Sequence, residues 1–206
     1  MKINRVIRML ILSDFITNSG FSLFGPIFAV FITKQIQGGG LEVVGFAAAI
    51  TQIFKATLQL PIARYLDKNH GEYDDFISMF VGSILIACTP FLFLFARLPV
   101  HVYAIQALQG IGLAMAIPPW YAIFTRHIDK MQENIEWSFE SIGIGISGGG
   151  AAAIGGIVAQ RIGFHYVFIV AGICAFIGLF VQTYIFQDLK KKVSQGVVKP
   201  APDRMV

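Results

Sequence analysis

Three polar residues recur at intervals of four within the first long apolar run of the sequence, and their types suit the binding of a proton or a cation. Asp14, Asn18 and Ser22 share one face if this run is a helix. A carboxylate in an apolar segment is costly unless it is paired or hydrated, so such residues mark ion pathways or internal ion pairs. Asp14 therefore has two interpretations, a proton or cation site and a structural ion pair, and the two can coexist.

The second apolar run contains a candidate partner for Asp14. Gln52, Lys55 and Gln59 also fall on one helical face. At 1.5 Å per residue, Asp14 lies about 9 Å and Lys55 about 15 Å from the same side of the membrane, a difference that a lysine side chain can span. We therefore expect an ion pair between them, and we expect its rupture to couple protonation of Asp14 to a change of access.

Polar residues also indicate which helices face the protein interior. The fourth apolar run carries Gln106 and Gln109, whereas the third and sixth runs contain little beyond Ser, Thr, Cys and Gln182. Polar side chains in a span usually face protein or water. We therefore expect the first, second, fourth and fifth helices to line the interior and the third and sixth to be the most exposed to lipid.

Glycines are concentrated in the fifth apolar run and predict close helix packing. Gly145 and Gly149 have the G-x-x-x-G spacing, and Gly155 and Gly156 are adjacent near the end of the run. Residues 143–148 also match a dinucleotide-binding fingerprint by letter. The strand and the acidic residue that this fingerprint needs are missing, so we expect no cofactor.

No other group of residues predicts enzyme chemistry. Glu136 and Glu140 lie at the expected start of the fifth helix, where they complement the helix dipole, and we expect them to be interfacial caps. Trp120, Tyr121 and Trp137 are expected in the interfacial aromatic belt or in packing. No nucleophile, base and orienting group stand at motif spacing, and the histidines are scattered. We expect no catalytic residue, no metal site and no enzyme.

Composition indicates that the apolar runs cross a membrane. The chain is 55% hydrophobic and 14% charged, whereas soluble domains contain about 25% charged residues. Each span must be helical, because lipid offers no partner for free backbone groups. The expected spans are 6–33, 43–66, 76–96, 100–125, 137–160 and 164–186. We therefore predict an all-α protein with a six-helix transmembrane domain at 1–186 and a polar cytoplasmic tail at 187–206.

Lysine and arginine are distributed unevenly between the two sides of these spans. Lys34, Arg97 and Arg161 fall on the outer side and Lys55 lies within a span, so the other twelve of the 16 fall on the inner side. Such residues mark the cytoplasmic face. We expect both termini in the cytoplasm and a bacterial-type cytoplasmic (inner) membrane as the location. The expected partners are the lipid bilayer and a small-molecule solute, with no nucleic acid.

An internal repeat relates the first and fourth apolar runs. Gly20 is followed six residues later by Pro26, and Gly112 is followed six residues later by Pro118. Three-helix repeats of inverted topology are a common construction in secondary transporters. We therefore predict a three-plus-three inverted repeat.

Four segments of the chain resemble the major facilitator superfamily. These are the Gly25–Pro26 step, the loop at 63–71, the residues Gln-Ala-Leu-Gln-Gly-Ile-Gly at 106–112, and the Gly-Phe-His sequence at 163–165 after the glycine pair of the fifth run. The whole chain resembles the family's N-terminal six-helix half, or a half-size member. The resemblance implies a carrier, and it implies a gating role for Asp67 and Lys68 in the loop.

The sequence departs from the family motifs at several positions. Ala63 replaces the loop glycine, Gln106 replaces an arginine linked in the family to proton coupling, and residues 151–152 are alanines where the antiporter motif has Gly-Pro. These departures weaken an assignment to proton antiport and leave the expected fold unchanged.

Two classes of function remain open. The first is a secondary transporter that moves a small solute by alternating access, with or without proton coupling. It would work as a parallel homodimer joined through the second and fifth helices, or as part of a twelve-helix carrier. The alternative is a non-transporting assembly or regulatory protein on the same scaffold. The altered motifs favour the alternative, and the polar faces of the first two helices favour transport.

Overall fold

The protein is an all-helical bundle in the computed structural model, which describes residues 3–68 and 71–194. Within these residues, six helical spans are long and apolar enough to cross a membrane, as predicted. The elements are α1 (Arg5–Phe24), η1 (Gly25–Ile27), α2 (Phe28–Gln35), α3 (Leu41–Lys68), α4 (Glu72–Phe93), α5 (Pro99–His127), α6 (Glu133–Arg161) and α7 (Phe164–Ser194). The first span comprises α1, η1 and α2.

The two prolines of the internal repeat have different effects on their helices. Pro26 lies in η1, a single 3₁₀ turn that interrupts the first span, as a residue without a backbone N–H allows. Pro118 and Pro119 lie inside α5, which continues past them. The repeat is therefore clearer in how the helices pack than in their local geometry.

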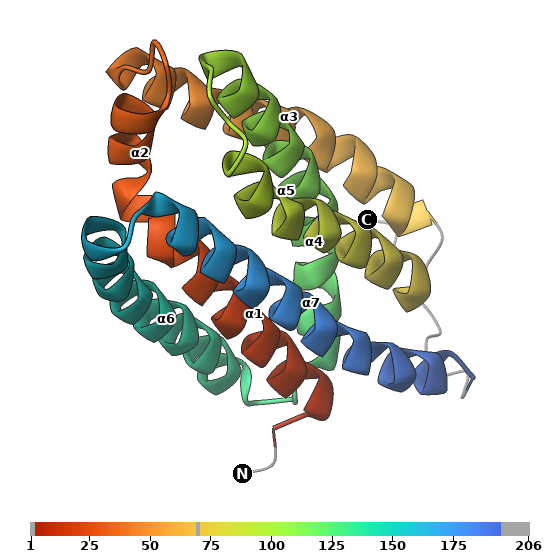
Figure 1. Ribbon diagram of the computed structural model, residues 1–206. Coiled ribbons are helices and arrows are strands. Elements are labelled where there is room, and N and C mark those ends of the chain that lie inside the picture. Colours follow the sequence, from red (N-terminus) through yellow and green to blue (C-terminus); the bar gives the residue numbers. More distant parts are fainter. Residues whose placement is uncertain (1–2, 69–70, 195–206) are drawn as a thin grey trace.

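The helices form two groups of three, with α1, α6 and α7 in one group and α3, α4 and α5 in the other (Figure 1). In the first group, α1 packs against α6 and α7. In the second, α5 packs against α3 and α4, and α4 meets α7 between the groups. If the first span is exchanged with the fourth, the second with the fifth and the third with the sixth, the same pairs of spans are in contact. The packing therefore agrees with the three-plus-three repeat.

Polar contacts between helix ends show that the spans alternate in direction. At one end, Asn4 Nδ2 donates to the carbonyl oxygen of His127, and Arg5 Nε lies 3.6 Å from Asp188 Oδ2. At the other end, the backbone N–H of Gln37 donates to the carbonyl oxygen of Arg97. The starts of α1 and the ends of α5 and α7 thus share one side of the bundle, which is the side expected in the cytoplasm.

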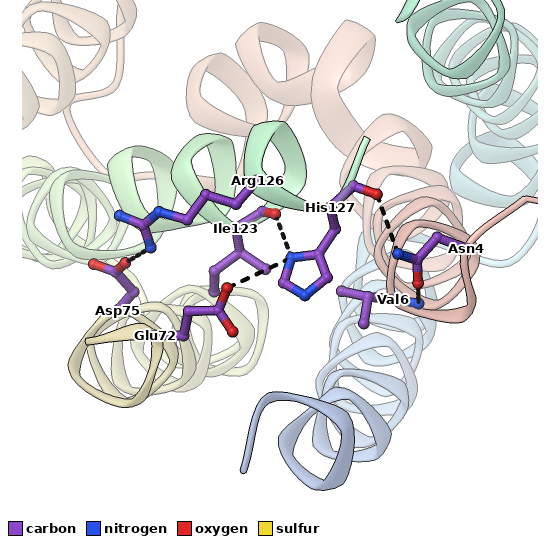
Figure 2. Close-up of polar contacts among 7 residues, drawn as sticks. All are labelled: Asn4, Val6, Glu72, Asp75, Ile123, Arg126 and His127. Carbon is purple, nitrogen blue, oxygen red and sulfur yellow. Dashed lines mark hydrogen bonds and ion pairs between the residues drawn. The ribbon is translucent and has the colours of Figure 1, made fainter. Parts of the chain in front are cut away.

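A cluster of polar contacts at this end joins α1, α4 and α5 (Figure 2). Arg126 pairs with Asp75, and His127 Nδ1 lies 3.9 Å from Glu72 Oε1. Asn4 caps α1 by accepting from the N–H of Val6. Three helices are therefore joined by polar contacts at this end of the bundle.

Removing the arginine of the Arg126–Asp75 pair is expected to destabilise the fold. The Asp75 side chain is 5% exposed, so Arg126→Gln leaves a buried carboxylate without its cation, at a cost on the order of 3 kcal/mol. Arg5→Gln removes an arginine that is 50% exposed and should cost about 1 kcal/mol or less. Thermal unfolding in one detergent compares the two variants. Equal melting temperatures would show that the Arg126–Asp75 pair contributes no more to stability than the exposed Arg5–Asp188 pair.

The third and sixth spans are not the most lipid-exposed, so that prediction is wrong. In α4 and α7, 44% and 39% of the most apolar window is buried, against 11% in α3 and 17% in α6. The reason is steric. A Cβ on Gly82 would lie 2.6 Å from the carbonyl oxygen of Gly112, and a Cβ on Gly20 would lie 2.7 Å from that of Ala171. Small residues thus allow these two spans to pack closely in the centre of the bundle.

The last helix extends beyond the predicted end of the transmembrane domain. α7 continues to Ser194, so the first residues of the expected tail at 187–206 are helical. Residues 195–206 lie outside the described residues, and the cytoplasmic tail stays a prediction.

Candidate functional site: a cavity between the two helix groups

A cavity of about 610 Å³ lies within the bundle, bordered by α1, α4, α5, α6 and α7. Its volume falls in the range of about 300–1,000 Å³ that is typical of small-molecule sites. The polar and aromatic residues that line it are Asp14, Thr17, Asn18, Phe21, Ser83, Gln109, Trp120, Tyr121, Trp137, Glu140, Ser141 and Gln182. The second span contributes no lining residue within the described chain, which corrects the expectation that it would face the interior cavity.

Two carboxyl groups from different helices meet in this cavity. Asp14 on α1 and Glu140 on α6 both line it, and their side chains interact with each other. Asp14 is nine residues and Glu140 seven residues from the start of its helix, or about 14 Å and 11 Å at 1.5 Å per residue. Both carboxyl groups therefore sit well inside their spans, at similar depths from the same end.

The α1–α6 interface positions this pair through a short hydrogen-bonded contact. Asn18 Nδ2 donates to Ser147 Oγ at 2.7 Å and to the carbonyl oxygen of Ile144 at 3.2 Å. Ser22, one turn further along α1, faces Gly148 of α6. The face shared by Asp14, Asn18 and Ser22 is thus directed at α6, and its first two residues line the cavity.

Aromatic side chains cover one wall of the cavity. Trp120 and Tyr121 come from the end of α5, and Trp137 comes from the start of α6. The ring centroids of Trp120 and Trp137 are 6.3 Å apart, and those of Tyr121 and Trp137 are 6.0 Å apart. Trp137 and Glu140 are three residues apart and so share a face of α6. An acid and an aromatic ring therefore lie together on the same wall.

The structure does not form the predicted ion pair between Asp14 and Lys55. Among the described residues no salt bridge joins them, and Lys55 does not line the cavity. The helices that pack closely against α1 are α6 and α7, so similar depths along their spans did not make Asp14 and Lys55 neighbours. On α3, Gln52 is exposed, and Lys55 and Gln59 are half-buried.

The two glutamines of the fourth span have different surroundings. Gln109 lines the cavity. Gln106 is buried, and its Oε1 accepts from Thr51 Oγ1 at 2.8 Å, which ties α5 to α3. Gln106 is therefore placed to hold two helices together, away from the cavity.

The remaining candidate residues lie outside the cavity. Asp67 and Lys68 are exposed at the end of α3, and their gating role stays a prediction. Gly155 packs against the backbone of Leu23. Gly145, Gly149 and Gly156 have open space where a side chain would be, within the described part of the chain.

Sequence reasoning missed Glu140 and the aromatic wall. Glu140 was expected at a helix start because the fifth span was placed at 137–160, whereas α6 begins at Glu133. This difference of one turn moves Glu140 from the interface into the span. The signal that could have found it is its spacing of three from Trp137 and four from Glu136, which is buried as well, because a repeated polar face inside a helix predicts an interior position.

A comparison with protein-family models agrees with this architecture. A comparison with curated proteins finds no match. A family model described as Major Facilitator Superfamily matches residues 10–203, which covers most of the first span and all of the other five. Members of this superfamily are generally membrane transporters and not enzymes. The chain is therefore an integral membrane protein that belongs to the Major Facilitator Superfamily.

Proposed function

We propose that the protein is a secondary transporter that moves a small solute by alternating access, with the cavity between the two helix groups as part of the solute path. The observation that carries this proposal is the pair of facing carboxyl groups inside a cavity of ligand size. A membrane protein with a purely structural role has no need to maintain two acids there, because each is costly to bury.

In this proposal Asp14 and Glu140 are the coupling site. Two carboxyl groups that face each other can bind one proton between them, and exposure of the pair to either side would let that proton enter or leave. Solute binding and proton binding at one cavity would then favour different conformations, which is the requirement for coupled transport.

We also propose that a second copy of the chain completes the carrier as a parallel homodimer. Gln52 and Lys55 lie on the least buried span, α3, and polar side chains in a span need protein or water beside them. On α6, Gly145 and Gly149 are open and spaced for close approach of another helix. The dimer would join α3 and α6 of one protomer to those of its partner, with both termini in the cytoplasm.

Cross-linking tests the homodimer. With Cys88 and Cys174 replaced by serine, a cysteine at Gly149 should cross-link two copies in native membrane. A control cysteine at Phe180, exposed on α7, should not. Dimers trapped equally from both positions, or none from Gly149 over a wide range of protein density, would contradict the assembly.

Vesicle reconstitution tests the transport function itself. Purified protein in sealed vesicles is supplied with a pH gradient and a panel of labelled anionic, neutral and cationic solutes. At least one class should accumulate above the level of protein-free vesicles, and collapse of the gradient should abolish its accumulation. Folded, dimeric protein that moves no member of the panel in either gradient direction would favour the alternative role as an assembly or regulatory protein.

A further inference from the structure

The charges lining the cavity have one sign. Asp14 and Glu140 are its only ionisable carboxyl groups, and no Lys, Arg or His occurs among the described lining residues. In a site surrounded by protein and lipid, an anionic ligand would be repelled strongly, because charges are poorly screened there. A cation would be attracted to the same groups.

Three polar atoms at the cavity have no hydrogen-bond partner within the described part of the chain. They are Glu140 Oε1, Gln182 Oε1 and Trp120 Nε1. Glu140 and Gln182 are each 5% exposed, and Trp120 is 8% exposed. Buried polar atoms are normally paired in folded proteins, so these atoms point to a ligand. Two of the three, Glu140 Oε1 and Gln182 Oε1, are acceptors, and unpaired acceptors in a cavity that also holds carboxyl groups suit a positively charged donor or a bare cation.

The aromatic wall supplies a complementary apolar surface. Trp120, Tyr121 and Trp137 line the same cavity as Glu140, and the ring centroids of Trp120 and Tyr121 are 5.2 Å apart. Indole and phenol faces attract cations within about 6 Å of the ring centroid, and they also stack on flat apolar bodies. An inorganic cation would use the carboxylates and leave this wall without a contact.

We propose that the cavity binds an organic cation with an aromatic or bulky apolar body, whose charge lies at Asp14 and Glu140 and whose body packs on Trp120, Tyr121 and Trp137. This proposal rests on the proposed transport function, since it names the class of solute that the cavity takes. A neutral polyol fits less well, because Asn18 and Ser147 already bond each other and the aromatic wall offers few polar groups.

Intrinsic fluorescence gives a direct binding assay. The chain has two tryptophans, and both line the cavity, so a ligand that enters it must change their emission. The protein in zwitterionic nanodiscs is titrated with tetraphenylphosphonium and, separately, with tetraphenylborate, which has the same shape and the opposite charge. We expect a saturable fluorescence change with the cation and none with the anion.

Matched variants show whether the carboxylates cause this selectivity. Glu140→Gln should weaken tetraphenylphosphonium binding at least tenfold, while Glu133→Gln, exposed on the same helix and outside the cavity, should bind like wild type. If Glu140→Gln is unstable, Asp14→Asn serves in its place. Equal binding of the two ions, or wild-type affinity in the cavity variant, would overturn the proposal.

The outcome separates this inference from the transport function. Selective cation binding by a protein that moves no solute in vesicles would contradict the carrier and leave the binding site standing. Accumulation of a neutral or anionic solute by a protein that does not bind tetraphenylphosphonium would contradict the site and leave the carrier standing.

Discussion

Gly155→Ala should cause a large loss of folded protein, whereas Gly156→Ala, at the next residue, should be tolerated. A Cβ on Gly155 would lie 1.8 Å from the carbonyl oxygen of Leu23 and 2.7 Å from its Cα. These are backbone atoms, which cannot rotate away, so α1 and α6 would have to separate along their whole contact. Overpacking typically costs about 1–3 kcal/mol where side chains can adjust, and we expect more here.

The control position differs only in what surrounds it. A Cβ on Gly156 would meet nothing within 4 Å, and alanine favours a helix over glycine by about 1 kcal/mol. Size-exclusion profiles and melting temperatures in one detergent compare the variants. Leu23→Ala should not rescue Gly155→Ala, because it removes no obstructing atom. Rescue by Leu23→Ala, or similar melting of the two glycine variants, would contradict the packing described for α1 and α6.

Asp14→Asn and Glu140→Gln should each leave the protein folded and reduce gradient-driven solute accumulation in vesicles at least tenfold. Both substitutions preserve shape and remove a proton-binding oxygen from the facing pair. If the two carboxyl groups act as one site, the double variant should lose no more than either single variant, since residues that act as a unit are not additive.

Two controls accompany this prediction. Glu42→Gln removes an exposed carboxylate at the start of α3, outside the cavity, and should transport like wild type. Lys55→Met tests the earlier expectation of an Asp14–Lys55 pair and should leave the gradient dependence intact. Multiplied losses in the double variant, or gradient dependence lost with Lys55→Met, would show that Glu140 is not the functional partner of Asp14.

The spans and their alternation could be predicted from the sequence because lipid imposes strict rules on length and composition. The position of Asp14 inside the first span followed from the same rules. Lateral neighbours could not be predicted in this way. The second span follows the first in the chain, yet α1 packs against α6 and α7, because the inverted repeat interleaves its two halves. Pairing Asp14 with Lys55 assumed that consecutive spans are adjacent.

Glu140 and the central position of α4 and α7 were missed for two further reasons. A shift of one helical turn in the start of α6 decides whether Glu140 is a cap or an interior residue, and apolar periodicity does not locate helix ends that closely. Polarity was also the wrong guide to burial in α4 and α7, whose close contacts depend on glycine and alanine, as at Gly82 and Gly172. Glycine spacing would have been the better signal.

The central claim is that the cavity opens in turn to the two sides of the membrane, and thiol accessibility tests it most directly. Ser83 lines the cavity and is eleven residues into α4, or about 16 Å from its start, near the middle of the span. In a protein lacking Cys88 and Cys174, Ser83→Cys should react with a membrane-impermeant thiol reagent in both right-side-out and inside-out vesicles. A cysteine at Phe180 on the outside of α7 should react in neither. Reaction of Ser83→Cys from one side only, under every gradient imposed, would contradict alternating access.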